Sequence, residues 1–449
     1  MKILIQNGRV MDPATGRDEM ADVAVAAGRI IAIGQVGSDF HPNRVVDAAG
    51  CVVAPGLVDL AVRLREPGQE HAGMLESEMS AAVAGGVTSL VCPPDTDPVL
   101  DEPGLVDMLK FRAEKLHLSR VFPLGALTRG LKGEVLTEMA ELTESGCIGF
   151  GQAEVAIVNT QVLQRALQYA ATFGFTVWLR PQDHWLGQGV AASGPLATRM
   201  GLSGVPAAAE TIALHTLFDL LRAVASRGSR ARVHLCRISS AAGLELVRQA
   251  KAEGLPVTCD VSVHNLLLTD VDIGFYDSRL RLQPPVRQQR DREALRAGLA
   301  DGTIDALVSD HNPVDADAKI LPFAEAEPGA TAVELLLGLA LRWAQQDGLG
   351  LMQALTVLTS GPQAVLGASL GTLQASVGRL AVGGVADICV FNPDSPWVVT
   401  SQALRSQGKH TPFGDQELPA RVRATLVGGQ VAYLAEASAT AVMPQASAV

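Results

Sequence analysis

Residues 232–261 read RVHLCRISSAAGLELVRQAKAEGLPVTCDV, and this stretch decides the fold. Residues 232–236 and 257–261 are short apolar runs, as expected for buried strands. Residues 241–253 between them have the pattern of apolar and polar residues that is typical of an amphipathic helix. A strand, a helix and a second strand in this order predict two parallel strands joined by a right-handed crossover.

The same alternation runs through the whole middle of the chain. Further strands are predicted at 87–91, 120–124, 147–150, 176–179 and 306–309. Further helices are predicted at 102–115, 161–172, 207–226 and 291–300. Seven or eight such units in succession predict an α/β fold of the (β/α)8 TIM-type barrel class.

Both ends of the chain have a different residue pattern, which is that of strands without intervening helices. Residues 2–11 and 22–36 alternate apolar and polar side chains, which is typical of half-buried strands. Further strands are predicted at 378–380, 386–391, 397–399 and 422–433. We therefore expect residues 1–54 plus 376–435 to form a small β-sandwich domain beside a barrel of residues 55–375. The Ala/Ser-rich stretch 436–449 is expected to be a disordered tail.

Composition excludes several classes of partner. The formal net charge is −11, which argues against binding to nucleic acid or to an anionic membrane, since phosphate contacts need a basic face. The six cysteines are scattered without a CxxC pair, as expected for reduced thiols of a cytoplasmic protein. No signal peptide and no membrane-spanning apolar window are recognisable.

Short motifs are spread over nearly the whole chain. They are VAPGLVD at 53–59, LREPG at 64–68, PDTDP at 94–98, PPVR at 284–287, DGTID at 301–305, SDHNP at 309–313, GRL at 378–380, ADI at 386–388 and TPFG at 411–414. Together they resemble the dihydroorotases of the cyclic amidohydrolase superfamily, over about residues 2–434. The resemblance implies opening of a dihydropyrimidine ring by water that one or two Zn²⁺ ions activate. Relatives acting on hydantoins, dihydropyrimidines or allantoin share the barrel but lack the LREPG pattern.

The resemblance also identifies four positions at which relatives bind the metal through histidine. The His-x-His pair expected after Asp59 is replaced by Ala61 and Arg63. The third and fourth histidine positions hold Arg180 and Arg237. Alanine has no donor atom, and arginine is always protonated and cannot coordinate zinc. We therefore expect no metal and no catalytic activity.

Acidic positions are partly retained. The bridging carboxylate of relatives falls near residues 150–153, where Gln152 stands and Glu154 is the nearest acid. Asp310 matches the family's aspartate ligand and is predicted to be vestigial. Three unpaired arginines in one cavity would be costly. We predict that they replace the charge of the metal and pair with Asp310, with Glu154 and Asp260 as further counter-ions. The alternative is a drifted site with solvated arginines.

The substrate-binding positions are mixed. Arg65 matches the arginine that clamps the substrate carboxylate, and His311 matches a substrate-contacting histidine. Asp95 stands where relatives have asparagine, and its charge would repel the same carboxylate. Arg65 either binds a ligand or pairs with an acid at the barrel mouth, and both alternatives stay open.

The remaining histidines do not suggest a replacement zinc site. His184 and His234 lie near the lost ligand positions but are expected to be structural, and His234 falls within an apolar strand. His71 and His264 lie on predicted loops without the spacing of a ligand cluster.

Three functions fit these observations. Dihydroorotase-like proteins that lack metal ligands assemble with aspartate carbamoyltransferase in several bacteria, and the resemblance implies that this chain is such a scaffold within an oligomer. An active dihydroorotase with unusual ligands is the second possibility. A regulatory barrel that binds small anions in an arginine-lined pocket is the third.

Overall fold

A closed ring of parallel strands forms the barrel that the strand–helix alternation predicts. The computed structural model describes residues 1–226, 228 and 230–435, so the predicted tail at 436–449 lies outside the described residues. The barrel strands, in chain order, are β6 (Leu57–Asp59), β7 (Val87–Cys92), β8 (Arg120–Pro123), β9 (Gly125–Ala126), β10 (Phe150–Gly151), β11 (Thr176–Leu179), β14 (Arg232–Leu235), β15 (Val257–Ser262) and β16 (Ala306–Val308).

Two details close the ring. Leu124 joins β8 to β9: its N–H donates to Cys92 of β7, and the next N–H, of Gly125, donates to Gly149 before β10. β8 and β9 are therefore consecutive halves of one barrel strand. A parallel bridge between Val62 and His311 connects the end of β16 back to the segment after β6.

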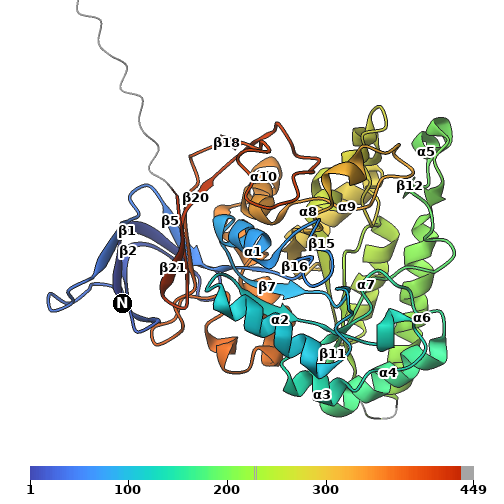
Figure 1. Cartoon of the computed structure of the whole chain (residues 1–449), viewed down its shortest axis with the longest axis horizontal. Coiled ribbons are helices and arrows are strands. Elements are labelled where there is room, and N and C mark those ends of the chain that lie inside the picture. Colours follow the sequence, from blue (N-terminus) through green and yellow to red (C-terminus); the bar gives the residue numbers. More distant parts are fainter. Residues whose placement is uncertain (227, 229, 436–449) are drawn as a thin grey trace, which may run out of the picture.

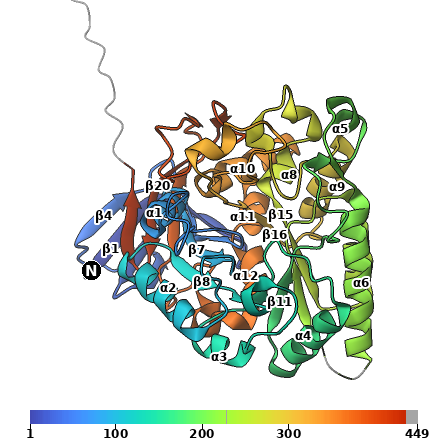
Figure 2. The same cartoon turned by 45° about the vertical axis from the view of Figure 1, so that its right-hand side comes forward.

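Helices follow the strands and cover the outside of the barrel (Figure 2). They are α1 (Leu75–Ala84), α2 (Pro103–Lys115), α3 (Met139–Glu144), α4 (Thr160–Phe173), α5 (Pro195–Met200), α6 (Ala207–Ala225), α7 (Ala241–Ala252), α8 (Val263–Leu267), α9 (Gln289–Ala300), α10 (Leu336–Gln346), α11 (Leu351–Thr356) and α12 (Ser360–Leu366). The five helices predicted from the sequence lie within two residues of their expected bounds. None of the described helices combines the length and apolar character that crossing a bilayer requires.

Short elements complete the loops. They are the 3-10 helices η1 (Arg129–Leu131), η2 (Asp270–Ile273), η3 (Ser278–Leu280), η4 (Ala316–Lys319), η5 (Val333–Leu335) and η6 (Gly367–Ala375), and the paired strands β12 (Ala191–Ala192) and β13 (Gly204–Val205).

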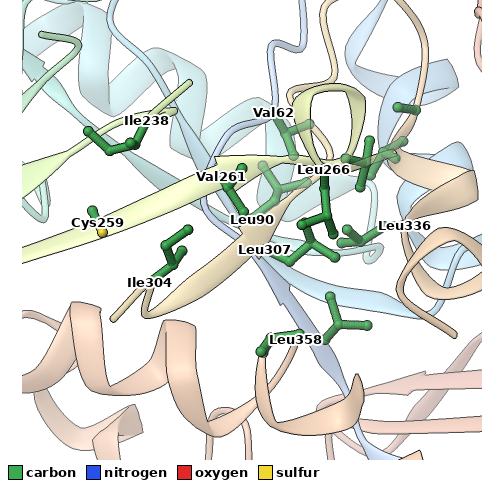
Figure 3. Close-up of a cluster of buried hydrophobic side chains, with 14 of the residues drawn as sticks. Val62, Leu90, Ile238, Cys259, Val261, Leu266, Ile304, Leu307, Leu336 and Leu358 are labelled. Atoms are coloured by element: carbon green, nitrogen blue, oxygen red, sulfur yellow. The ribbon is translucent and has the colours of Figure 1, made fainter. Parts of the chain in front are cut away.

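The barrel core is aliphatic, in keeping with an aromatic content of only 4%. Leu90 of β7, Val261 of β15 and Leu307 of β16 are fully buried and belong to one cluster, which continues outward to Leu336 of α10 (Figure 3). Branched side chains from successive strands fill a barrel of this kind, so its interior is packed rather than open.

The second domain is a curled sheet built from both chain ends, and it stands at one side of the barrel (Figure 1). Its strand order is β21-β20-β17-β5-β1-β2-β3, with β4 also pairing with β1. Their bounds are β1 (Lys2–Asp12), β2 (Arg17–Ala26), β3 (Arg29–Gly34), β4 (Arg44–Asp47), β5 (Val52–Pro55), β17 (Ile388–Asn392), β20 (Arg421–Val427) and β21 (Gln430–Leu434). β17 runs antiparallel to β5, with Val390 opposite Val53. The prediction of a barrel with a composite β-sandwich domain is confirmed.

Two of the predicted strands at the C-terminal end differ. Residues 378–380 form a turn, because Gly378 adopts a left-handed φ of 68° and the N–H of Leu380 donates to the Asp12 side chain instead of to a strand. Residues 397–399 contribute β18 (Trp397–Val398), which pairs only with β19 (Glu417–Leu418), outside the large sheet.

Candidate functional site

Three arginines lie at the carboxyl ends of barrel strands. Arg63 follows β6, Arg180 follows β11 and Arg237 follows β14. Because active sites of such barrels lie at this end, the three side chains occupy the place where a catalytic centre is expected. Their side chains are only 3–6% exposed. Buried guanidinium groups at this depth require compensating charge.

Glu154 supplies most of that compensation. Its Oε1 atom lies 2.6 Å from Nη2 of Arg237 and 2.8 Å from Nη2 of Arg63. Its Oε2 atom lies 2.5 Å from Nε of Arg180. One carboxylate therefore contacts all three guanidinium groups and forms the centre of an ion cluster.

Asp95 and Asp310 complete the ion cluster. Asp95 Oδ2 accepts from Nε of Arg63 at 2.8 Å. Asp310 Oδ1 lies 2.8 Å from Nη1 of Arg237 and 3.9 Å from Nη1 of Arg63. Three arginines thus face three carboxylates, and their formal charges balance. Asp95 was expected to repel a substrate carboxylate, but its charge is engaged by Arg63 instead.

The pKa values reflect this coupling. Burial alone would raise the pKa of Glu154, but Arg180, Arg237 and Arg63 outweigh it and hold that pKa well below its usual value. Burial alone would lower the pKa of Arg237, but Asp310 and Glu154 raise it well above its usual value. Burial dominates for Asp310, whose pKa is raised, and for Arg180, whose pKa is lowered. Glu154 and Arg237 therefore stabilise each other's charged forms.

Asp260 is not a counter-ion of a guanidinium group, contrary to the prediction. Its Oδ2 atom lies 2.9 Å from Nε2 of His234, and its Oδ1 atom accepts from the backbone N–H of Arg237 at 2.6 Å. Asp260 lies within β15, so its carboxylate reaches the neighbouring strand β14 rather than the arginine side chains.

Gln152 does not lie in the ion cluster, although it stands where the bridging carboxylate of relatives is expected. Its amide exchanges hydrogen bonds with Thr128 at 2.9–3.0 Å and donates to the carbonyl of Leu131. Ala153 adopts a left-handed φ of 49°, which changes the direction of the chain after β10. The next side chain, Glu154, therefore reaches the arginines. In the sequence, the signal for Glu154 is that it is the acid nearest to residues 150–153, where relatives have the bridging carboxylate.

Ala61 lies at the edge of the ion cluster. With Arg63, Arg180, Arg237 and Cys236 it lines a cavity of about 30 Å³. That volume accommodates one or two water molecules and is far below the size of a pyrimidine-binding pocket. In this cavity the ion cluster leaves room for water but not for a pyrimidine ring.

Arg65 is held by neutral acceptors. Its Nε donates to the carbonyl of Pro313 at 2.7 Å, and its Nη1 donates to Oε1 of Gln69 at 2.5 Å. Among the described residues no carboxylate lies within ion-pair distance of it, so of the two alternatives left open for Arg65, pairing with an acid is not observed. Burial, and next the charge of Arg63, lower the pKa of Arg65 to about 10.

His311 does not face the ion cluster. Its ring is fully buried, with Nε2 2.7 Å from Oε2 of Glu78 in α1. Its Nδ1 accepts from the N–H groups of Ala332 and Val333 at 3.1 and 3.3 Å. Both ring nitrogens are therefore engaged, and the predicted contact with a substrate does not fit this arrangement.

The residues at the family's metal positions do not fit a zinc ion, because Ala61 offers no donor and the three arginines are cations. Among the described residues, His234, Cys236 and Asp260 place ligand-type atoms within 4.8 Å of one another. His234 is already bonded through both nitrogens, to Asp260 and at 2.8 Å to Thr258, which supports the structural role predicted for it.

The other histidines are dispersed. His184 packs edge-on against Trp185 at the surface, and His71 is also exposed. His264 is buried and stacks on Phe413. None of them joins the ion cluster.

Comparison with known proteins identifies the family. A family model described as "Dihydro-orotase-like" matches residues 50–242, and one described as "Amidohydrolase family" matches residues 202–432. The chain belongs to the dihydroorotase-like proteins of the amidohydrolase family. A "Dihydroorotase-like protein" of Pseudomonas aeruginosa is 44% identical over 434 residues, which cover 96% of this chain and 100% of the relative.

Other relatives of this dihydroorotase-like chain are named "Dihydroorotase". A protein named "Dihydroorotase" from a Geobacter species is 38% identical, over 97% of this chain and 100% of the relative. Among solved structures, the L-hydantoinase (dihydropyrimidinase) of Arthrobacter aurescens superimposes with a TM-score of 0.83, covering 96% of this chain and 95% of that chain at 23% identity. At that identity the structural likeness establishes the fold alone.

Proposed function

We propose that this dihydroorotase-like chain is a non-catalytic cytoplasmic subunit that supports the assembly of aspartate carbamoyltransferase in pyrimidine biosynthesis. The observation that carries the proposal is the ion cluster, in which Arg63, Arg180 and Arg237 stand where the family's metal-binding histidines would be.

The side chains at the family's metal positions lack the groups that the family's chemistry uses, which supports a non-catalytic role. Hydrolysis of a cyclic amide needs an activated water and a proton acceptor. Guanidinium groups neither bind zinc nor accept protons at neutral pH. Asp310 is the retained acidic group, and its Oδ1 lies 2.8 Å from Nη1 of Arg237, so this oxygen is engaged in an ion pair instead of being free to accept a proton from water.

Retention of the whole fold without this chemistry supports a structural role. The ion cluster connects loops that follow four different barrel strands, through Arg63, Glu154, Arg180 and Arg237. These ion pairs hold the loops at the barrel mouth in one arrangement. A protein-binding surface needs such a fixed arrangement. The charges balance within the ion cluster, so it offers no excess positive charge to a small anion, and this disfavours the regulatory anion-binding alternative.

Reconstitution with the cell's own aspartate carbamoyltransferase tests the proposal. We expect the two chains to co-elute in size-exclusion chromatography as a defined oligomer, and the transferase to need this chain for full assembly and activity. A transferase that assembles and reaches full activity without this chain would refute the proposed role.

An active dihydroorotase with unusual ligands is the alternative that the relatives named "Dihydroorotase" keep open. Metal analysis and ring-opening activity on dihydroorotate, measured on the same sample, separate the two. We expect no turnover with or without added Zn²⁺. Stoichiometric zinc together with turnover would establish the alternative.

A further inference from the structure

A cavity of about 190 Å³ lies between α4, α6 and the loops that follow β10 and β11. The two helices are neighbours on the outside of the barrel (Figure 2). We call this space the side cavity. Arg180 connects it to the ion cluster, but of the described residues that line it, none is a position at which the family resemblance implies substrate binding. The side cavity is therefore a separate space beside the barrel mouth.

The lining of the side cavity is mostly apolar. Leu163 of α4, Leu179 of β11 and Leu217 of α6 belong to its walls. Ile212 and Trp185 also line it and are 45% and 72% exposed, so they mark the side that is open to solvent. A ligand that covers these side chains removes apolar surface from water, which favours its binding.

Three polar side chains of the lining are bonded to other protein groups. Arg180 donates to the side chain of Gln182, and its Nη2 donates to the carbonyl of Glu154 at 3.3 Å. Gln182 donates to the carbonyl of Gly187 at 3.0 Å, and the amide of Gln152 is engaged outside the cavity. These groups offer few free hydrogen bonds to water, and displacing poorly held water by an apolar group gains affinity.

Asp183 gives the side cavity a negative charge. Its Oδ1 accepts from the backbone N–H groups of Trp185 and Leu186 at 3.0 and 2.9 Å. Within the part of the chain that the structure describes, its Oδ2 has no hydrogen bond and no cation lies within ion-pair distance of it. Arg180 does not compensate for this charge, because its guanidinium group is paired with Glu154. A ligand cation would therefore be attracted here.

The walls of the side cavity are held in place without a ligand. The N–H of Asp183 donates to the carbonyl of Ala209 in α6 at 2.7 Å, which fixes the loop after β11 to that helix. Asn159 caps the first turn of α4. The N–H of Val155 donates to the carbonyl of Gln152 at 3.0 Å, which fixes the loop after β10. Because the walls are already ordered, a ligand binds at a low entropic cost.

We propose that the side cavity binds a small aromatic amine, with its ring between α4 and α6 and its ammonium group at Asp183 and the indole of Trp185. A cavity of about 150 Å³ holds a benzene molecule, so the volume here suits one ring or two fused rings. The face of a tryptophan ring attracts a cation, and a carboxylate adds to that attraction. The inference goes beyond the proposed function and does not depend on it.

Tryptamine is the probe, because it joins a two-ring indole to an ammonium group. Isothermal titration calorimetry with the full-length chain measures its binding. Indole-3-propionate carries a carboxylate on the same ring, and ethylamine carries the ammonium group without a ring. We expect tryptamine to bind at a single site and both comparison compounds to bind about tenfold more weakly or less.

Two variants test the assigned location. Ala213→Phe places a ring into the side cavity from α6 and should weaken tryptamine binding by about tenfold or more. Ala223→Phe, further along the same helix and outside the lining, is the matched control and should bind tryptamine like the natural chain. Circular dichroism establishes that each variant is folded.

A third variant tests the charge. Asp183→Asn keeps an oxygen acceptor for the two backbone N–H groups but removes the negative charge. It should weaken tryptamine binding by about tenfold without weakening that of indole-3-propionate. Asp219→Asn makes the same change in net charge at a side chain of α6 that is 78% exposed, and it should have no effect.

Three outcomes would overturn the inference. The first is no saturable binding of tryptamine up to about 10 mM. The second is equal affinity for tryptamine and indole-3-propionate, which would show that the site does not select an amine. The third is unchanged binding by Ala213→Phe, which would place the ligand elsewhere. None of these outcomes bears on assembly with the transferase, so the proposed function is tested separately.

Discussion

Glu154 and Arg237 form the central ion pair of the barrel mouth, with Oε1 and Nη2 2.6 Å apart. Because the same carboxylate also contacts Arg63 and Arg180, its removal leaves three guanidinium groups facing only two acids. The consequence for stability is large and can be measured directly.

Glu154→Gln should destabilise the fold. Breaking a buried ion pair costs about 3–5 kcal/mol, and the 28% exposure of the Glu154 side chain places the expected loss at the lower end, about 3 kcal/mol. Urea denaturation measures this difference. Glu134→Gln, at an exposed position, should change the free energy of unfolding by less than about 0.5 kcal/mol. Equal stability of the two variants would show that Glu154 does not hold the ion cluster together.

Asp59→Asn should increase stability at high pH. Burial raises the pKa of Asp59 to about 7, and its Oδ2 atom has no hydrogen-bond partner. An acid whose folded-state pKa is raised makes stability fall as pH rises from its unfolded pKa of about 4 to about 7. Asparagine removes that titration. We expect a gain of about 1–3 kcal/mol at pH 8, as one unit of pKa corresponds to about 1.4 kcal/mol.

The same gain should vanish at about pH 3, below both pKa values, where Asp59 is protonated in the folded and the unfolded state. Chemical denaturation of the natural chain and of Asp59→Asn at several pH values provides the comparison. A gain that is independent of pH would show that packing, rather than charge, limits stability at this position.

His311→Ala should act on folding. The substitution removes the imidazole that bonds Glu78 and accepts from two backbone N–H groups, all of which are buried. Leaving these groups unpaired should cost about 2–4 kcal/mol. His184→Ala, at the surface, serves as the control and should have little effect on the free energy of unfolding. A stable His311→Ala variant with altered ligand binding would instead support the family's substrate-contacting role.

Chelation should leave the protein unchanged. Neither the ion cluster nor the doubly bonded His234 offers a free ligand set, so EDTA should shift the melting temperature by less than about 1 °C. Differential scanning calorimetry before and after dialysis against chelator measures this shift. A fall of more than about 4 °C, reversed by Zn²⁺, would show that a structural metal contributes to stability.

The barrel could be predicted from the sequence because its strands and helices follow local rules. The run at 176–179 has the composition of a buried strand, and β11 has the same bounds. The three arginines could be placed at one end of the barrel because the resemblance puts them at the metal-ligand positions that follow barrel strands. The sequence predicts Asp310 and Glu154 as their partners, but it does not predict the left-handed backbone at Ala153, after which Glu154, and not Gln152, reaches the arginines.

Long-range side-chain contacts could not be predicted. His311 resembles a ligand-contacting residue in its motif, but its ring is turned toward Glu78, 233 positions earlier in the chain. No local pattern encodes that pairing. Asp260 illustrates the same limit at shorter range, because its two oxygen atoms are taken by His234 of β14 and by the backbone N–H of Arg237 just after that strand.

The pairing of β5 with β17 has a consequence for synthesis on the ribosome. Val53 pairs with Val390, so one edge of β5 has no strand partner until roughly 340 further residues have been synthesised. At about 5–20 residues per second, that delay is on the order of 20–70 s. During this interval an apolar, fully buried strand of the finished protein is an open edge, which other chains can pair with. Nascent chains arrested before β17 should therefore be the form that chaperones retain and that aggregates first.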